Sequence, residues 1–151
     1  MEFNLETAKM YAENGRSEEW VHAYLTTGEW ANFGLSDGLK LQKRYWRGPL
    51  KLPLDALVRT CGPEPDMRYR VSQKDWDRRT NAIATSVATI EELPPFILQY
   101  VAGELIVCDG NHRYGALHKL DWAECWAFIW YDSMQEFEQH HDQLDSITKQ
   151  I

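Results

Sequence analysis

A short polar stretch, Asp109-Gly110-Asn111-His112-Arg113, stands between an apolar strand-like run and a helix-like run. Gly110 permits close backbone approach or a positive φ, and Asn111 is a good helix cap. His112 and Arg113 would begin the helix, where unsatisfied N–H groups favour an anion. Arginine can also hold a phosphate through two hydrogen bonds at once. The stretch therefore predicts an anion site formed by residues 110–113 and suited to a chain of phosphates.

Asp109 needs a separate explanation, because a carboxylate would repel a phosphate directly. It could hold Mg²⁺ or act as a base, or it could fix Arg113 or His112. The alternative is that Asp109 and Arg113 form a structural ion pair and that His112 is a hydrogen-bonded histidine of the cap region. The stretch lacks the glycines of a Rossmann fingerprint and the Gly-Lys-Ser/Thr of a Walker loop, so neither site is predicted.

Two other groups of polar residues could contribute. The segment 61–67 contains two prolines and a glycine, so it should be a rigid loop, and its acids Glu64 and Asp66 could orient a substrate or serve in catalysis. The other interpretation is a structured turn with solvated acids. Arg78, Asn81 and Thr85 share one side of an expected helix, opposite its apolar stripe. They either face solvent or line a pocket.

Apolar periodicity and cap residues predict the elements that position these groups. The loop should follow a hairpin, formed by 96–101 and 104–108, and should open a helix. The other expected elements are two short helices within 4–27 with Asn4 as a cap, a third helix at 36–46, an edge strand at 50–54, a helical turn at 56–60, a helix capped by Ser72, a helix at 111–120, a strand at 122–131 and a terminal helix capped by Ser133 and Glu136.

Length and composition favour one packed domain, since the chain has 151 residues of which 44% are hydrophobic. No apolar run approaches the roughly 20 residues that span a membrane, the start lacks a secretory signal, and the three cysteines suit free thiols in the cytoplasm. The formal net charge is −7, although residues 40–80 hold eleven Lys/Arg against five Asp/Glu. The overall field should repel nucleic acid, and the basic segment either contacts an acidic partner or a phosphate or is a solvated face.

The loop and its surroundings resemble one known family. Asp-Gly-Asn-His-Arg-Tyr-x-Ala-Leu after a short apolar strand is similar to the ligand loop of the ParB N-terminal domain and sulfiredoxin superfamily. The resemblance covers about residues 49–131, including the entry strand and turn Leu52-Pro53-Leu54-Asp55-Ala56-Leu57. It implies an α+β fold, with a small mixed sheet packed by helices. The expected organisation is a helical extension at 1–48, a nucleotide-binding core at 49–131 and a C-terminal helix at 132–151, in one compact domain.

The resemblance also implies a ligand, a nucleoside triphosphate (ATP or CTP) with Mg²⁺. His112 and Arg113 match phosphate-contacting residues of the family, and Arg78, Asn81 and Thr85 match its second phosphate-binding pattern. In sulfiredoxin the reacting cysteine stands where this chain has Asn111, so reduction of sulfinic acids is not expected.

The leading hypothesis is therefore triphosphate-dependent phosphoryl transfer or hydrolysis. Asp109, His112, Glu64 and Asp66 are its candidate catalytic residues, and Asp109 is its candidate metal ligand. One alternative is a non-catalytic nucleotide-sensing module that docks a protein partner or a second copy through the extra helices. Another is a DNA-binding or nuclease-type ParB-like protein.

Overall fold

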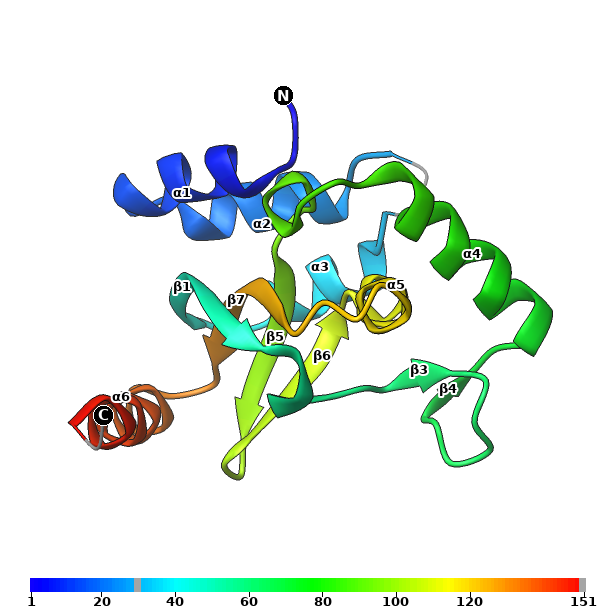
Figure 1. Ribbon diagram of the computed structural model, residues 1–151. Helices are drawn as coiled ribbons and strands as arrows, with labels where there is room; N and C mark the ends of the chain where they lie inside the picture. Colours follow the sequence, from blue (N-terminus) through cyan, green and yellow to red (C-terminus); the bar gives the residue numbers. More distant parts are fainter. Residues whose placement is uncertain (29–30, 150–151) are drawn as a thin grey trace.

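A mixed five-stranded sheet forms the centre of the protein in a computed structural model, which describes residues 1–28 and 31–149 (Figure 1). The strand order is β1-β7-β5-β6-β2. β1 and β7 are antiparallel, β7 and β5 parallel, β5 and β6 antiparallel, and β6 and β2 parallel. The predicted α+β class with a mixed sheet is confirmed. The predicted terminal helix reached residue 151, and its last two residues lie outside the described range.

The elements follow one another in an order that places helices before, between and after the strands. The bounds are α1 Leu5–Glu13, α2 Ser17–Leu25, α3 Phe33–Leu39, β1 Tyr45–Pro53, the 3₁₀ turn η1 Leu54–Ala56, β2 Leu57–Val58, β3 Cys61–Gly62, β4 Tyr69–Arg70, α4 Gln73–Ser86, the 3₁₀ turn η2 Ile90–Glu92, β5 Phe96–Val101, β6 Glu104–Asp109, α5 Asn111–Lys119, β7 Glu124–Tyr131 and α6 Met134–Lys149. No helix in the described part of the chain is both long and apolar enough to cross a membrane.

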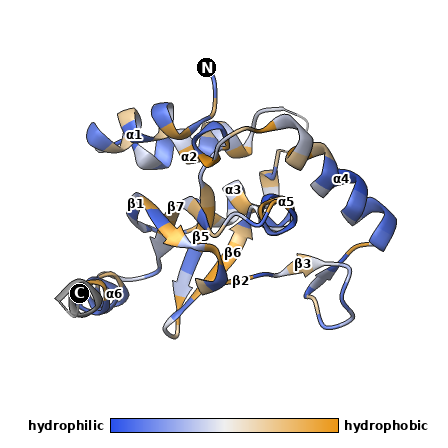
Figure 2. Ribbon diagram, viewed as in Figure 1, coloured by the Kyte–Doolittle hydropathy of each residue, from blue (hydrophilic) through white to orange (hydrophobic). Residues whose placement is uncertain are grey.

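The central strands are buried on both faces, so alternate side chains of one strand enter two different cores. Phe96, Leu98 and Tyr100 of β5 join the core that α5 completes with Leu117. Ile97, between them, joins the other core, which the N-terminal helices complete with Trp20 and other residues. Figure 2 shows the apolar colouring of the strands between these helices. The N-terminal helices thus share a core with the sheet.

Most predicted elements near the loop are confirmed. The hairpin of β5 and β6 turns at Ala102 and Gly103, which both have positive φ. Ser72 accepts a hydrogen bond from the Asp75 N–H and caps α4. Asn4 caps α1 in the same way, through the Thr7 N–H.

Two predicted elements between residues 33 and 60 are wrong. The third helix is α3, which begins at Phe33 because Asn32 caps its start and ends at Leu39. Residues from Tyr45 onward pair with β7 instead of continuing the helix. β1 therefore begins four residues before the predicted core. The expected helical turn at 56–60 contains strand β2, which pairs in parallel with β6. Tertiary strand pairing overrides the local helical pattern in both places.

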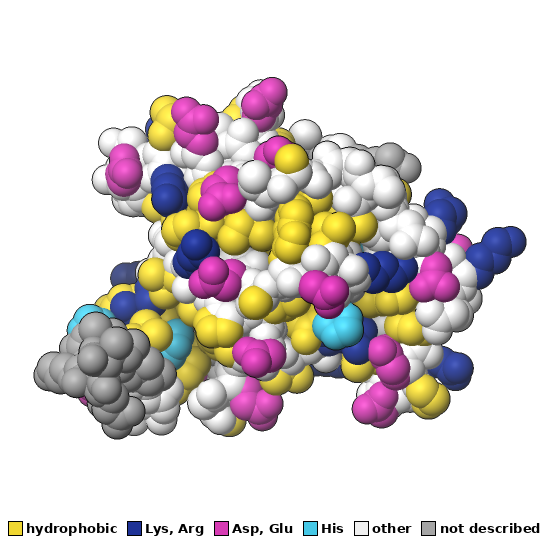
Figure 3. All heavy atoms as spheres, in the orientation of Figure 1, with side chains coloured by type: hydrophobic (Ala, Val, Ile, Leu, Met, Phe, Trp, Pro, Cys, Tyr) yellow, Lys and Arg dark blue, Asp and Glu magenta, His cyan; other side chains and the backbone are white. Residues whose placement is uncertain are grey.

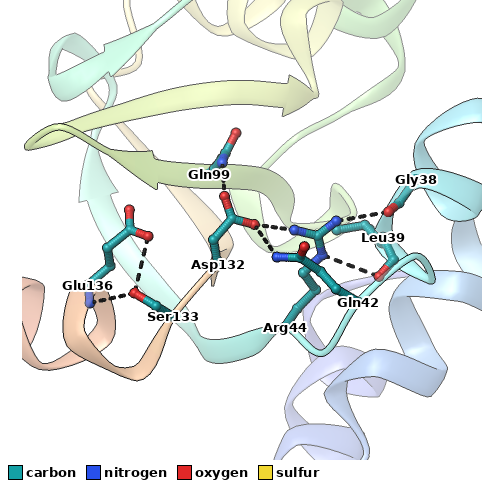
Figure 4. A network of polar contacts seen from close by, with 8 residues as sticks. All are labelled: Gly38, Leu39, Gln42, Arg44, Gln99, Asp132, Ser133 and Glu136. Carbon is teal, nitrogen blue, oxygen red and sulfur yellow. Dashed lines mark hydrogen bonds and ion pairs between the residues drawn. The ribbon is translucent and has the colours of Figure 1, made fainter.

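Arg44, within the basic run after α3, makes contacts inside the fold. Arg44 donates to the carbonyl oxygens of Gly38 (2.9 Å) and Leu39 (3.3 Å) at the end of α3 and pairs with Asp132. Asp132 also accepts from Gln42 (3.1 Å) and from Gln99 of β5 (3.2 Å), as Figure 4 shows. Arg44 therefore joins α3 to the end of β7, just before Ser133 caps α6, and is not part of a solvated face.

Candidate functional site

The loop after β6 turns directly into α5 at a glycine. Gly110 has φ +123°, and a Cβ at this position would lie 2.9 Å from the Phe96 ring, so a larger residue would be strained and crowded. Gly110 is the N-cap of α5 and makes no side-chain cap hydrogen bond. The prediction that Asn111 caps this helix is therefore wrong. In the described part of the chain, Gly110 leaves the first-turn N–H groups of α5 without a side-chain cap, and the start of a helix without such a cap favours an anion.

Arg113 anchors the loop from inside the protein. Its Nη2 donates to Asp109 Oδ2 at 2.5 Å, and its Nη1 donates to the carbonyl oxygens of Pro94 and Pro95. The Arg113 side chain is 8% exposed and that of Asp109 is 15% exposed. The guanidinium carbon also lies 5.5 Å from the Tyr24 ring centre and 5.1 Å from that of Phe96. The alternative prediction of a structural Asp109–Arg113 ion pair is confirmed.

The Asn111 side chain is also committed to the fold. Its Oδ1 accepts from the backbone N–H groups of Thr60 (2.9 Å) and Cys61 (3.1 Å), and its Nδ2 donates to Thr60 Oγ1 (3.1 Å). Asn111 is buried. It therefore ties the start of α5 to the segment between β2 and β3, and its backbone N–H is the group left for a ligand.

His112 is neutral and pairs with Arg79, which is not among the predicted site residues. Arg79 Nη1 lies 3.3 Å from His112 Nε2 and can only donate, so Nε2 accepts and the imidazole proton is on Nδ1. Burial, together with the charges of Arg79 and Arg113, lowers the pKa of His112 to about 4. The Trp76 ring packs against the imidazole with centres 5.0 Å apart. His112 therefore offers a hydrogen-bond donor and no charge at neutral pH.

A pocket of about 550 Å³ opens beside this loop. Its charged groups come from the loop and from Arg79. Its other lining residues come from Phe3 before α1, Tyr24 of α2, the segment between α2 and α3, α4 and the segment before β5. The lining residues are Phe3, Tyr24, Thr27, Gly28, Ala31, Asn32, Arg79, Ala82, Ile83, Ser86, Leu93, Pro94, Asp109, Gly110, Asn111, His112 and Arg113. The volume and the mixture of apolar walls with a few polar groups suit a small-molecule ligand.

The predicted polar side of α4 does not face this pocket. Arg78 is exposed and lies 3.5 Å from Asp75, Asn81 accepts from Lys119 Nζ at 2.9 Å, and the Thr85 hydroxyl is exposed. Trp76 and Thr80 face the core, so residues on the opposite side of the helix point away from the protein. Arg79, Ala82, Ile83 and Ser86 border the buried stripe and line the pocket. Helical phase relative to that stripe is the signal that identifies Arg79.

The two acids of the 61–67 loop also lie away from the pocket lining. Glu64 is 2.7 Å from Arg59, and this hydrogen bond lowers the pKa of Glu64. Asp66 is exposed. Of the predicted catalytic residues, the pocket brings together Asp109 and His112. Within residues 1–28 and 31–149, no three His, Cys, Asp or Glu side chains cluster as a metal site.

Comparisons with known proteins find similarity at the level of structure. No family model and no curated protein matches the chain. Sulfiredoxin from Arabidopsis thaliana matches with 24% identity and a TM-score of 0.43, over 60% of this chain and 93% of that protein. A free serine kinase in complex with AMP matches with 22% identity and a TM-score of 0.39, over 53% of this chain and 30% of the kinase.

A conserved hypothetical protein from Pyrococcus furiosus matches with 20% identity and a TM-score of 0.40, over 53% of this chain and 31% of that protein. Sulfiredoxin and the serine kinase are both proteins that the loop resemblance indicated. At these identities and TM-scores the matches indicate a similarity of fold and say nothing about chemistry.

Proposed function

We propose that the protein binds a nucleotide in the 550 Å³ pocket, with a phosphate at the start of α5 beside Arg79 and the nucleoside against the apolar wall. The observation that carries the proposal is the combination, in one pocket, of a helix start without a side-chain cap, an arginine and an apolar surface. Each of these alone is common. Together they match the two chemically different parts of a nucleotide.

The phosphate would be held mainly by groups other than the predicted Arg113. The N–H groups of Asn111, His112 and Arg113 stand at the positive end of α5, and Arg79 and the Nδ1–H of His112 add side-chain donors. Phe3, Ile83 and Leu93 line the same pocket and provide apolar surface for a base.

Ligand binding to the folded state raises its melting temperature, so a thermal-shift screen of nucleotides tests the proposal. A nucleotide at about 100 times its Kd should stabilise the protein by about 2.7 kcal/mol. Arg79→Gln should remove most of this shift. Its matched control is Arg78→Gln, the adjacent arginine on the outer side of α4. Equal shifts in both variants would contradict the role of Arg79, and no shift with any nucleotide, with or without Mg²⁺, would contradict the proposal.

Triphosphate-dependent phosphoryl transfer or hydrolysis is a second candidate function, favoured by the carboxylate of Asp109 in the pocket lining. Asp109 would bind Mg²⁺ through the oxygen that Arg113 does not use, and His112 would accept or donate a proton. Release of phosphate from ATP or CTP that requires Mg²⁺ and is lost in Asp109→Asn would support this candidate. Absence of turnover with all four ribonucleoside triphosphates and either Mg²⁺ or Mn²⁺ would exclude it.

A further inference from the structure

We propose that the pocket prefers a nucleotide with a single phosphate to one with a bare phosphate chain, and that the Asp109–Arg113 ion pair sets this preference. The inference rests on the proposed nucleotide binding and concerns how that same site chooses its ligand.

The charges that line the pocket are few. Among the described lining residues, Arg79 and Arg113 are cations and Asp109 is an anion, which leaves one net positive charge. His112 adds none at neutral pH because burial holds its pKa near 4. A single phosphate carries a charge of about −1.5 to −2 at pH 7, so one phosphate already exceeds this positive charge.

The ion pair keeps its carboxylate in place and its guanidinium occupied. For Arg113 to turn toward a ligand, it would have to leave Asp109 and the carbonyl oxygens of Pro94 and Pro95. These carbonyl groups would lose a charge-assisted hydrogen bond in a buried place, which is costly. Tyr24 and Phe96 also pack near the guanidinium. Arg113 is therefore a positioning residue that does not move to neutralise a second phosphate.

Additional phosphates would consequently meet a fixed carboxylate. Asp109 immediately precedes Gly110, the N-cap beside which the first phosphate would lie. Like charges that are close together and partly shielded from water repel strongly. Repulsion of this kind is a common way to reject one ligand in favour of another. A phosphate chain without a bound cation is rejected, whereas one phosphate fits.

Isothermal titration calorimetry on the full chain, in chelator at constant ionic strength, provides the test. AMP, ADP and ATP are titrated separately. The affinity should fall along this series, with AMP binding at least about tenfold more tightly than ATP, a difference of about 1.4 kcal/mol. Asp109→Asn should bring the ATP affinity to within about threefold of the AMP affinity, about 0.65 kcal/mol. Asp142→Asn, an exposed change on α6 that removes the same charge, should leave the ratio at its wild-type value.

A second pair of variants leaves the ion pair intact and covers the possibility that Asp109→Asn folds poorly. Ser86→Lys adds a cation to the pocket wall and should raise the affinity for ATP more than that for AMP. Thr85→Lys adds the same charge to the exposed side of α4 and should change neither. ATP binding more tightly than AMP in chelator, or an unchanged ratio in both Asp109→Asn and Ser86→Lys, would overturn the inference and leave nucleotide binding standing. No binding of any of the three nucleotides would overturn the proposed function as well.

Discussion

At the scale of single residues, the side chains of Asn111 and Arg113 stabilise the fold, although the sequence motif that contains them resembles a ligand-binding loop. Both side chains bond to protein groups, and the neighbouring backbone N–H groups are what the loop offers to a ligand. Two of the cysteines are chemically unreactive because they are buried. Burial raises the pKa of Cys108 to about 11 and that of Cys125 to about 12. Both thiols therefore stay protonated at neutral pH and are poor nucleophiles.

Truncation of Asn111 should destabilise the protein, because the backbone N–H groups of Thr60 and Cys61 lose their acceptor and the Thr60 hydroxyl, which still donates to the Val107 carbonyl oxygen, loses one donor. Asn111→Ala is expected to lower the free energy of unfolding by about 1–3 kcal/mol, measured by urea denaturation. Asn111→Asp keeps the acceptor for both N–H groups and should cost less. The control is Asn81→Ala, at an exposed position. A loss in Asn111→Ala no larger than in Asn81→Ala would show that these hydrogen bonds do not anchor the loop.

At the scale of elements, the pocket depends on close packing between α4 and α5. Gly115 of α5 lies against α4, where an added Cβ would come within 2.5 Å of the Trp76 ring and 2.7 Å of the Thr80 methyl group. α4 carries Arg79 and α5 begins at the loop, so the separation of these helices sets the distance between the two parts of the proposed phosphate site.

Gly115→Ala should therefore push the helices apart. We expect a loss of about 1–3 kcal/mol in unfolding free energy from overpacking, together with weaker nucleotide binding by calorimetry. Gly38→Ala is the matched control, since Gly38 lies within α3 and a Cβ there meets nothing within 4 Å. That control should be neutral or stabilising, because alanine favours a helix. A Gly115→Ala protein as stable as wild type would show that the interface can relax without cost.

At the scale of the whole molecule, one terminal helix is held by a chain of polar contacts. Figure 3 shows several Lys and Arg side chains at the α4 edge, with Asp and Glu side chains among them and over the rest of that face. On the other side of the sheet centre from this edge, α6 docks through buried His140. Arg47 Nε donates to the Tyr131 hydroxyl (3.0 Å), which in turn lies 2.5 Å from His140 Nδ1.

His140 and His112 make the stability of the protein depend on pH. Burial lowers the folded-state pKa of His140, and likewise of His112, to about 4, below the ordinary value of 6.5. The unfolded chain binds more protons between these values, so stability is complete above pH 6.5 and falls as the pH drops toward 4. The slope is at most about 1.4 kcal/mol per pH unit for each histidine.

Denaturation of a His140→Gln variant across this range checks the prediction. Glutamine can still accept a hydrogen bond from Tyr131 but does not titrate. The slope of unfolding free energy against pH between pH 6.5 and 4 should therefore fall by up to about 1.4 kcal/mol per pH unit, the contribution of one proton. His118→Gln, on the exposed surface of α5, controls for the loss of an imidazole. Identical pH slopes in wild type and His140→Gln would show that His140 does not contribute.

The sequence by itself determined the local features of the site. Caps, turn residues and apolar periodicity act over a few residues, and they suffice for the hairpin, the glycine turn and the start of α5 at residue 111. The same local patterns failed at residues 40–60, where strand pairing with distant β6 and β7 outweighs helical propensity. Only the tertiary structure decided that Arg113 faces Asp109, Pro94 and Pro95 and that Arg79 and not Arg78 faces the pocket. It also decided that Phe3, Tyr24 and the segment between α2 and α3 line the pocket. The reason is that these outcomes depend on which surfaces are buried together, and burial is a property of the packed chain and not of a short segment.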